Sequence, residues 1–204
     1  PQLHLISDDI YEHLVYDDFK FVTMATIAPD LQDRILTVNG VSKSYCMTGW
    51  RIGYGSGPVP LIKAMAKVQS QSTSSPNSMA QYAAIAALEG PLDFMAENRA
   101  AFARRRQLVC EALNNIDGID CPLPDGAFYV YPSIAKLIGK KRPDGKIIES
   151  DSDFVSYLLE AGEVAVVPGV AFGLSPYFRI SYAAADDVLA DAMQRIARVT
   201  ASLS

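Results

Sequence analysis

The chain has 204 residues, of which 50% are hydrophobic and 20% are charged. Its 18 basic and 23 acidic side chains give a net charge of −5, which argues against a domain that neutralises a nucleic-acid backbone. No apolar run reaches the roughly 18 residues that a membrane span needs, and the three cysteines show no zinc or disulfide spacing. We therefore expect a cytoplasmic protein with neither a nucleic-acid nor a membrane partner.

The first half of the sequence alternates short apolar segments with helical patterns. Strand patterns occupy Leu3–Ile6, read as a buried strand that ends in a polar loop, then Ile35–Val38 and Arg51–Tyr54. Helical spacing of apolar residues follows over Pro60–Gln71 and over the alanine-rich segment Ser78–Glu89. Strands and helices that alternate in this way predict an α/β fold with a mostly parallel sheet covered on both faces.

The second half begins with one unusually long helical pattern, from Leu92 to Ile116, and then changes character. An aromatic strand at Phe128–Tyr131 is followed by a polar and exposed loop at Leu137–Ser150 and a helix at Asp153–Ala161. Two strands, at Val164–Val167 and Phe178–Tyr182, precede a last helix that starts at about Asp186. This order predicts a smaller α+β unit from about residue 117, joined to the first unit by the long helix.

Lys43 is the best candidate for a nucleophile. It lies just past a predicted apolar strand, among small residues that let a ligand approach the backbone. A lysine amine becomes nucleophilic when burial or a neighbouring cation lowers its pKa. Eight residues further on, Arg51 offers a fork of donors suited to phosphate. From spacing alone, a solvated surface lysine and an arginine paired with a protein carboxylate are the more common explanation, since most lysines are solvated.

Asp8 and Tyr11 form a second pair, at the carboxyl end of the first predicted strand. Open α/β sheets bind ligands at this edge. An aspartate there could keep a heteroaromatic ring nitrogen protonated, and a phenol three residues later could bond a neighbouring oxygen. The alternative is that the aspartate caps a short helix and the tyrosine packs at its edge.

Arg179 alternates with apolar neighbours in a predicted strand, so it should face away from Phe178 and Ile180. An arginine in that position needs an anionic partner. The sequence leaves open whether the partner is a carboxylate of the protein or of a substrate.

Other patterns indicate structure rather than chemistry. The run Arg104–Arg106 points three ways around a helix and predicts a solvated, salt-bridged face. The glycine-rich segment 53–57 lacks the order of a phosphate-binding loop and predicts a turn. The only histidines, His4 and His13, lack metal-ligand spacing and accompany no nucleophile motif, so we expect neither a metal site nor a hydrolase triad.

Taken together, these residues resemble a known family. Residues 40–53, GVSKSYCMTGWRIG, resemble the pyridoxal-phosphate attachment motif of class I aminotransferases, which belong to fold type I. Four further segments resemble motifs of that family in the same order along the chain. They are DDIYE at 8–12, GAFY at 126–129, PGVAFG at 168–173 and FRIS at 178–181.

The resemblance implies a role for each candidate residue. Lys43 would carry the pyridoxal 5′-phosphate aldehyde and, when substrate displaces it, move a proton between the substrate Cα and the cofactor. Asp8 would keep the pyridine nitrogen protonated, and Tyr11 would bond the phenolic oxygen of the ring. Arg51 would hold the cofactor phosphate. Arg179 would bind the α-carboxylate of the substrate.

The resemblance also implies how the chain is organised. Residues 1–91 would be the C-terminal part of the large cofactor-binding domain, 92–116 the long interdomain helix and 117–204 the small C-terminal domain. Family members are longer, and every matching motif lies in their C-terminal half. We therefore expect this chain, which begins at Pro1 without an initiator methionine, to be a fragment that binds the cofactor weakly and transaminates poorly. The intact protein is expected to be an active homodimer.

The likeness is strongest to bacterial members that use aspartate, which implies transfer of the amino group from aspartate to 2-oxoglutarate, giving oxaloacetate and glutamate. The expected partners are thus small amino acids and keto acids. The same motifs also serve other fold-type-I enzymes, such as a C–S lyase, a cyclopropane-forming synthase or an aromatic aminotransferase. A non-catalytic domain that senses pyridoxal phosphate is a further alternative.

Overall fold

The structure is a computed structural model that describes residues 3–204. The chain divides into two compact units, Pro1–Arg99 and Ala100–Ser204. The boundary between them falls inside one long helix, α4 (Asp93–Asn114). Among residues 3–204, no helix combines the length and the hydrophobicity that crossing a bilayer requires.

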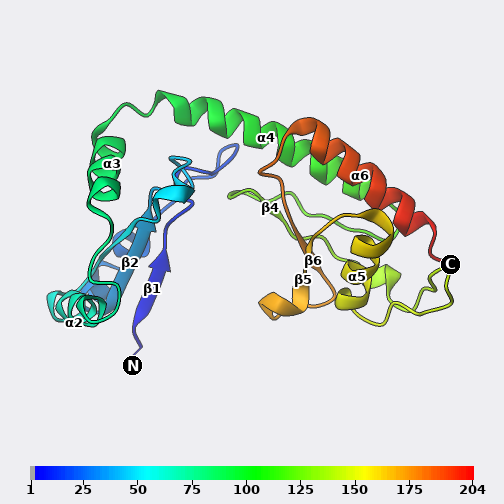
Figure 1. Cartoon of the computed structure of the whole chain (residues 1–204), viewed down its shortest axis with the longest axis horizontal. Helices are drawn as coiled ribbons and strands as arrows, with labels where there is room; N and C mark the ends of the chain where they lie inside the picture. The colour runs from blue at the N-terminus through cyan, green and yellow to red at the C-terminus, as the bar shows by residue number, and fades with distance from the viewer. Residues whose placement is uncertain (1–2) are drawn as a thin grey trace. The chain divides into compact units, whose positions relative to one another are not determined.

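The sheet of the first unit has β2 (Ile35–Gly40) at its centre, between β1 (Leu5–Asp8) and β3 (Gly53–Ser56). β1 pairs with β2 in parallel, and the two strands lie side by side in Figure 1. β3 pairs with β2 in the antiparallel direction. The described part of this sheet therefore contains one parallel and one antiparallel pair.

The positions of these strands differ from the sequence-based prediction at their ends. β1 lies two residues later than predicted, because its pairing with β2 continues as far as Asp8 opposite Val38. It is also not fully buried, since Ile6 is 74% exposed. β3 begins at Gly53 rather than Arg51, because Arg51 adopts a left-handed conformation with φ 52° and interrupts the extended chain.

Helices and short 3₁₀ turns connect and follow these strands. They are α1 (Met24–Ile27), η1 (Pro29–Arg34), η2 (Thr48–Trp50), α2 (Val59–Ser70) and α3 (Ser78–Glu89). α3 begins where the Asn77 side chain accepts hydrogen bonds from the amides of Met79 and Ala80, an N-cap that satisfies two otherwise free donors. α2 and α3 coincide closely with the helices predicted from apolar spacing.

The apolar residues of the long helix predicted over Leu92–Ile116 form one buried stripe. In and just after α4, Met95, Val109, Leu113 and Ile116 are all buried, and Phe102 packs against the hydrophobic core of the second unit. Residues at these spacings share one face of a helix, so the stripe fixes which face of α4 is covered.

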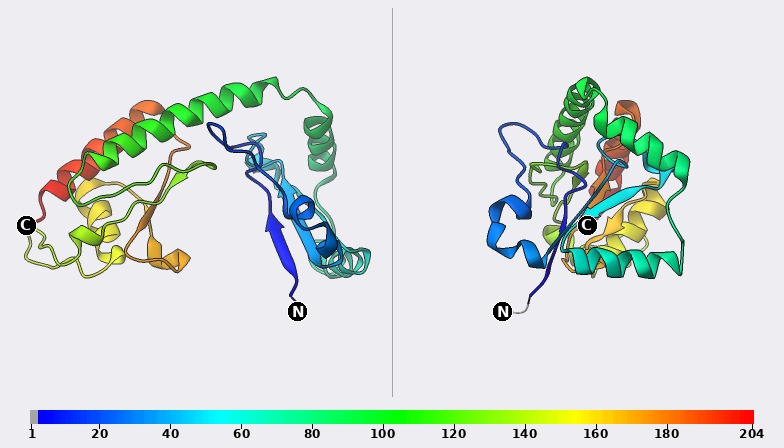
Figure 2. Two further views of the ribbon diagram at one scale, coloured as in Figure 1. Left: turned by 180° about the vertical axis from the view of Figure 1, so that it is seen from behind. Right: turned by 90° about the vertical axis from the view of Figure 1, so that its left-hand side faces the viewer.

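The sheet of the second unit is antiparallel, with β6 (Phe178–Ser181) between β4 (Tyr129–Val130) and β5 (Val167–Pro168). α5 (Asp151–Gly162) packs against α6 (Asp186–Ala201). Figure 2 shows α6 running beside the second-unit half of α4. Two 3₁₀ turns, η3 (Ala135–Leu137) and η4 (Gly169–Phe172), complete the unit.

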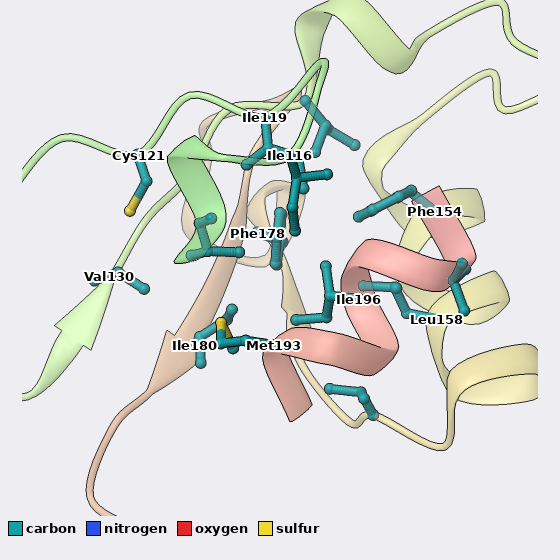
Figure 3. Packing of buried hydrophobic residues seen from close by; sticks show 14 of the residues in the cluster. Ile116, Ile119, Cys121, Val130, Phe154, Leu158, Phe178, Ile180, Met193 and Ile196 are labelled. Atoms are coloured by element: carbon teal, nitrogen blue, oxygen red, sulfur yellow. The ribbon is translucent and has the colours of Figure 1, made fainter. Parts of the chain in front are cut away.

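The core of the second unit lies between its helices and its sheet. Figure 3 shows Phe154 of α5 and Ile196 of α6 close to Phe178 of β6, and all three are fully buried. The ring centroids of Phe154 and Phe178 are 5.5 Å apart. Buried apolar area of this kind supplies most of the driving force for folding.

Two predictions about exposed segments were wrong in part. The segment Leu137–Ser150 is not a loose surface loop, because Leu137 and Ile148 are fully buried in the core. The arginine run is not uniformly solvated. Arg104 and Arg105 form ion pairs with Asp186, whereas Arg106 is only 4% exposed and donates a hydrogen bond to the carbonyl of Pro124 at 2.9 Å.

Candidate active site

The first unit brings Asp8 and Lys43 to the same edge of its sheet. Asp8 is the last residue of β1, and Lys43 follows the end of β2 by three residues. Because β1 and β2 are parallel, their carboxyl ends meet at one edge, where open α/β sheets bind ligands. The Asp8 side chain is exposed at this edge, and its Oδ1 accepts a hydrogen bond from the amide of Ile10 at 3.3 Å.

Tyr11 lies in the turn that follows β1 and faces the lysine. The Lys43 Nζ is 5.9 Å from the centroid of the Tyr11 ring, and the lysine is half-buried. The turn that carries Lys43 is fixed by two backbone hydrogen bonds, from Cys46 to Lys43 at 3.2 Å and from Met47 to Val41 at 3.3 Å. Val41 is fully buried and anchors the turn.

Gly40 shows how tightly this edge is packed. A Cβ at Gly40 would lie 3.1 Å from both Ile10 Cδ1 and the carbonyl oxygen of Ile52, closer than side chains normally approach. The absence of a side chain thus lets the turn after β1 and the start of β3 close over the end of β2.

Arg51 reaches the same neighbourhood through the pairing of β2 with β3. Gly53 of β3 pairs with Gly40 of β2. Arg51 precedes Gly53 by two residues, and Lys43 follows Gly40 by three residues. The left-handed backbone of Arg51 turns the chain between η2 and β3. Its guanidinium donates a hydrogen bond to the carbonyl of Thr48 at 2.8 Å and is otherwise exposed.

Arg179 belongs to the second unit and has a different environment. As predicted, it faces away from Phe178 and Ile180, which are both buried. Its guanidinium carbon lies 4.5 Å from the ring centroid of Tyr129 and 4.2 Å from that of Phe172, within the range of cation–π contacts. No carboxylate of the described second unit forms an ion pair with it.

The segment that supplies Phe172 is held from two sides. Asp151, at the start of α5 and 1% exposed, accepts hydrogen bonds from the Val170 amide at 3.0 Å and the Ser175 hydroxyl at 2.5 Å. The Tyr131 hydroxyl donates to the carbonyls that begin and end the turn, at 3.0 and 3.1 Å. Burial, and then the nearby carboxylate of Asp151, raise the pKa of Tyr131, which keeps this hydroxyl a donor.

The sequence-predicted residues therefore fall into two groups. Asp8, Tyr11, Lys43 and Arg51 surround one edge of the first sheet, where the Lys43 Nζ lies over the Tyr11 ring, 5.9 Å from its centroid. Arg179 lies on β6 of the second unit. Sequence reasoning missed the residues that hold Arg179, although the aromatic positions lie inside the GAFY and PGVAFG motifs. The supporting residues are Tyr129, Phe172, Tyr131 and Asp151.

The folds of both units and the match to known sequences define the class of protein. The family described as "Aminotransferase class I and II" matches residues 2–196, and the chain belongs to this family. Its fold is that of the fold-type-I aminotransferases.

Individual relatives are similar along the entire chain. The present chain is 61% identical over 204 residues to the aspartate/prephenate aminotransferase of Cereibacter sphaeroides. It is 58% identical over 204 residues to the aspartate aminotransferase of Rhizobium meliloti strain 1021. These matches cover 100% of this chain but only 51% and 50% of the relatives. The chain thus spans about half the length of the curated relatives it matches.

Solved structures give the same result. The crystal structure of the aspartate aminotransferase from Rhizobium meliloti superposes with a TM-score of 0.97 at 57% identity, covering 100% of this chain and 51% of that one. The aromatic aminotransferase from Pyrococcus horikoshii OT3 superposes with a TM-score of 0.84 at 39% identity, covering 97% of this chain and 51% of its own.

Proposed function

We propose that this chain takes part in pyridoxal-phosphate-dependent transamination, with aspartate as amino donor and 2-oxoglutarate as acceptor. One observation carries the proposal: similarity along the whole chain to relatives whose names specify aspartate. The name of the Cereibacter protein adds prephenate, a second keto acid that merits a test as acceptor. Small amino acids and keto acids are thus the proposed partners.

The residues of the first unit fit the proposed cofactor. The edge of its sheet offers a half-buried amine beside a phenol, an exposed carboxylate and an exposed guanidinium, and a glycine permits close backbone approach. The amine matches the aldehyde of pyridoxal phosphate, and the phenol matches its phenolic oxygen. The carboxylate matches the pyridine nitrogen, and the guanidinium matches the phosphate. When bound, pyridoxal phosphate supplies an electron sink for the charge that develops at the substrate Cα.

Each residue then has a defined task. Lys43 would hold the cofactor covalently through its Nζ and would move a proton at the substrate Cα. Asp8 holds a proton on the pyridine nitrogen, Tyr11 donates a hydrogen bond to the phenolic oxygen, and Arg51 binds the phosphate. Arg179 binds the substrate α-carboxylate in a bidentate pair, a role supported by the finding that no carboxylate of residues 3–204 forms an ion pair with its guanidinium.

We propose the domain organisation that the motifs implied. Residues 1–91 belong to a large cofactor-binding domain, 92–116 form the interdomain helix, and 117–204 form the small domain. The division of contacts at Arg99, within α4, is compatible with this assignment. We further propose that the intact protein works as a homodimer in the cytoplasm, in amino-acid biosynthesis.

Other reactions use the same residue types. The likeness to an aromatic aminotransferase favours aromatic substrates as the second candidate. A C–S lyase would release ammonia rather than transfer the amino group, and a sensor domain would bind cofactor without turnover. A panel of amino donors, scored separately for keto-acid formation and ammonia release, separates these possibilities.

The cofactor assignment is tested by borohydride reduction of the full-length protein with pyridoxal phosphate, followed by peptide mass spectrometry. We expect a pyridoxyl group on the peptide that contains Lys43. Lys43→Ala should remove it, whereas Lys67→Ala, a matched change of an exposed lysine on α2, should not. Modification elsewhere, or none at all, would show the assignment to be wrong. The 204-residue chain alone should transaminate poorly, and rapid turnover by it would contradict that expectation.

A further inference from the structure

Two cysteines of the second unit lie close together, and neither is one of the proposed active-site residues. Cys110 is on α4, and Cys121 follows that helix. Both are free and buried, each 3% exposed. Their sulfur atoms are 3.8 Å apart, and the Cys121 thiol donates to the Cys110 sulfur.

The distance between them is imposed by the backbone rather than by the thiols. Asn114 lies one helical turn after Cys110, and its side chain forms hydrogen bonds with both the amide and the carbonyl of Cys121. Its side-chain amide donates to the Cys121 carbonyl at 2.9 Å, and its carbonyl oxygen accepts from the Cys121 amide at 2.8 Å. Residues four apart share one face of a helix, so Asn114 holds the second cysteine over the first.

The local charges make the two sulfur atoms unequal. The hydrogen bond from Cys121 holds the pKa of Cys110 below its ordinary value, against the effect of burial and with help from the positive charge of Arg106. The same hydrogen bond and burial raise the pKa of Cys121. Cys110 accepts the hydrogen bond of the Cys121 thiol and therefore takes the role of nucleophile, since the thiolate is the reactive form.

A small reagent can reach the pair from solvent. The two cysteines form part of the wall of a surface hollow of about 400 Å³. Its other lining residues are Gln107, Glu111, Asn114, Asn115 and Leu123. The hollow is large enough for a peroxide molecule, whose size is close to that of water.

We propose that Cys110 and Cys121 form a dithiol modification site that hydrogen peroxide converts to an intramolecular disulfide. The Cys110 thiolate gives an electron pair to one peroxide oxygen, the O–O bond breaks, and hydroxide leaves and is protonated to water. Cys121 then loses its proton and attacks the Cys110 sulfur, the S–O bond breaks, and a second water leaves. In total, two thiols are oxidised and one peroxide is reduced to two waters.

The structural change this step requires is small. A disulfide has an S–S length of about 2.05 Å, so the sulfur atoms must approach by nearly 2 Å from their separation of 3.8 Å. This inference does not depend on the proposed transaminase function, because neither cysteine belongs to the residues assigned to it.

The test is peroxide treatment of the purified native protein, followed by alkylation of free thiols and peptide mapping without reductant. We expect one cross-linked peptide pair, joining Cys110 to Cys121 and lighter by two hydrogen atoms, which a dithiol reductant reverses. Exposed Cys46 is the internal reference and should stay outside the cross-link. The matched variant Cys46→Ser should leave the cross-link unchanged, whereas Cys121→Ser should abolish it and leave Cys110 as a sulfenic acid that a dimedone probe traps.

A second measurement removes any dependence on the variants. In denaturant the hydrogen bonds of Asn114 are lost, so the wild-type protein should give mixed pairings that include Cys46. The proposal is overturned if native wild-type protein keeps both buried thiols alkylatable after peroxide treatment, or if Cys46 takes part in the major cross-link. It is also overturned if Cys110 accumulates as sulfinic acid while Cys121 is intact.

Discussion

Replacement of Asp151 by alanine tests how the Arg179 site is supported. The carboxylate is 1% exposed and accepts two hydrogen bonds, from the Val170 amide and the Ser175 hydroxyl. It is the only side chain of α5 that the structure shows bonded to the turn carrying Phe172, within the described residues. The substitution removes both acceptor contacts and opens a small polar void.

The expected magnitude follows from these two bonds. A hydrogen bond to a charged group contributes about 1.5–3 kcal/mol. Because Val170 and Ser175 lie in an exposed segment, water can partly replace the lost acceptor, so the lower end of the range applies to each. We therefore expect Asp151→Ala to lower the free energy of unfolding by about 3 kcal/mol, a large part of the 5–15 kcal/mol that is typical of a domain.

The assay is urea unfolding followed by far-UV circular dichroism, together with hydrogen exchange of the Val170 amide. The control is Asp187→Ala, which removes an exposed carboxylate from the first turn of α6 and should cost only about 0.5 kcal/mol. Asp151→Asn keeps one oxygen acceptor and should fall between the two. The reasoning is refuted if Asp151→Ala unfolds within 0.5 kcal/mol of the wild type, or if the Val170 amide exchanges no faster.

Two further predictions concern the second unit. Gly169→Ala should destabilise it by about 2 kcal/mol, because a Cβ there would overlap the carbonyl oxygen of Leu174; a urea titration that shows unchanged stability would contradict this. Hydrogen bonds from Arg105 and Arg104 hold the pKa of the Asp186 carboxyl below its ordinary value of 3.8. The stability that the Asp186 carboxylate contributes is therefore present above pH 3.8 and is lost as the pH falls through the lowered pKa. Asp186→Asn should therefore lower the urea midpoint at neutral pH, and the difference from wild type should disappear in strong acid.

Helices were the most predictable part of this fold, because their signals are local. α3 begins and ends at the predicted residues Ser78 and Glu89, where a capping side chain and a following glycine mark the limits. The strand β1 was displaced, because its end at Asp8 depends on pairing with a strand that lies 30 residues away in the sequence. Burial of Ile148 in a polar segment also depends on tertiary packing, which composition alone does not report.

The candidate site was predictable in residue type but not in its support. A motif of consecutive residues identifies Lys43 and Arg51, and the period of two along a strand gives the direction of Arg179. The rings against Arg179 come from β4 and from η4, and no local pattern connects those segments to each other. Asp151 lies just before the helix predicted over Asp153–Ala161, and only its burial and its hydrogen bonds to Val170 and Ser175 reveal that it holds another segment in place.

The contact of Arg179 with two aromatic rings has a consequence for the thermodynamics of ligand binding. A long arginine side chain in solvent samples many rotamers and loses that freedom when it grips a ligand. Here the rings of Tyr129 and Phe172 already restrict the guanidinium before any anion arrives. Much of the rotamer entropy of the Arg179 side chain is therefore lost when the protein folds and not when a ligand binds. The loss of side-chain entropy on binding a carboxylate at Arg179 should be correspondingly small.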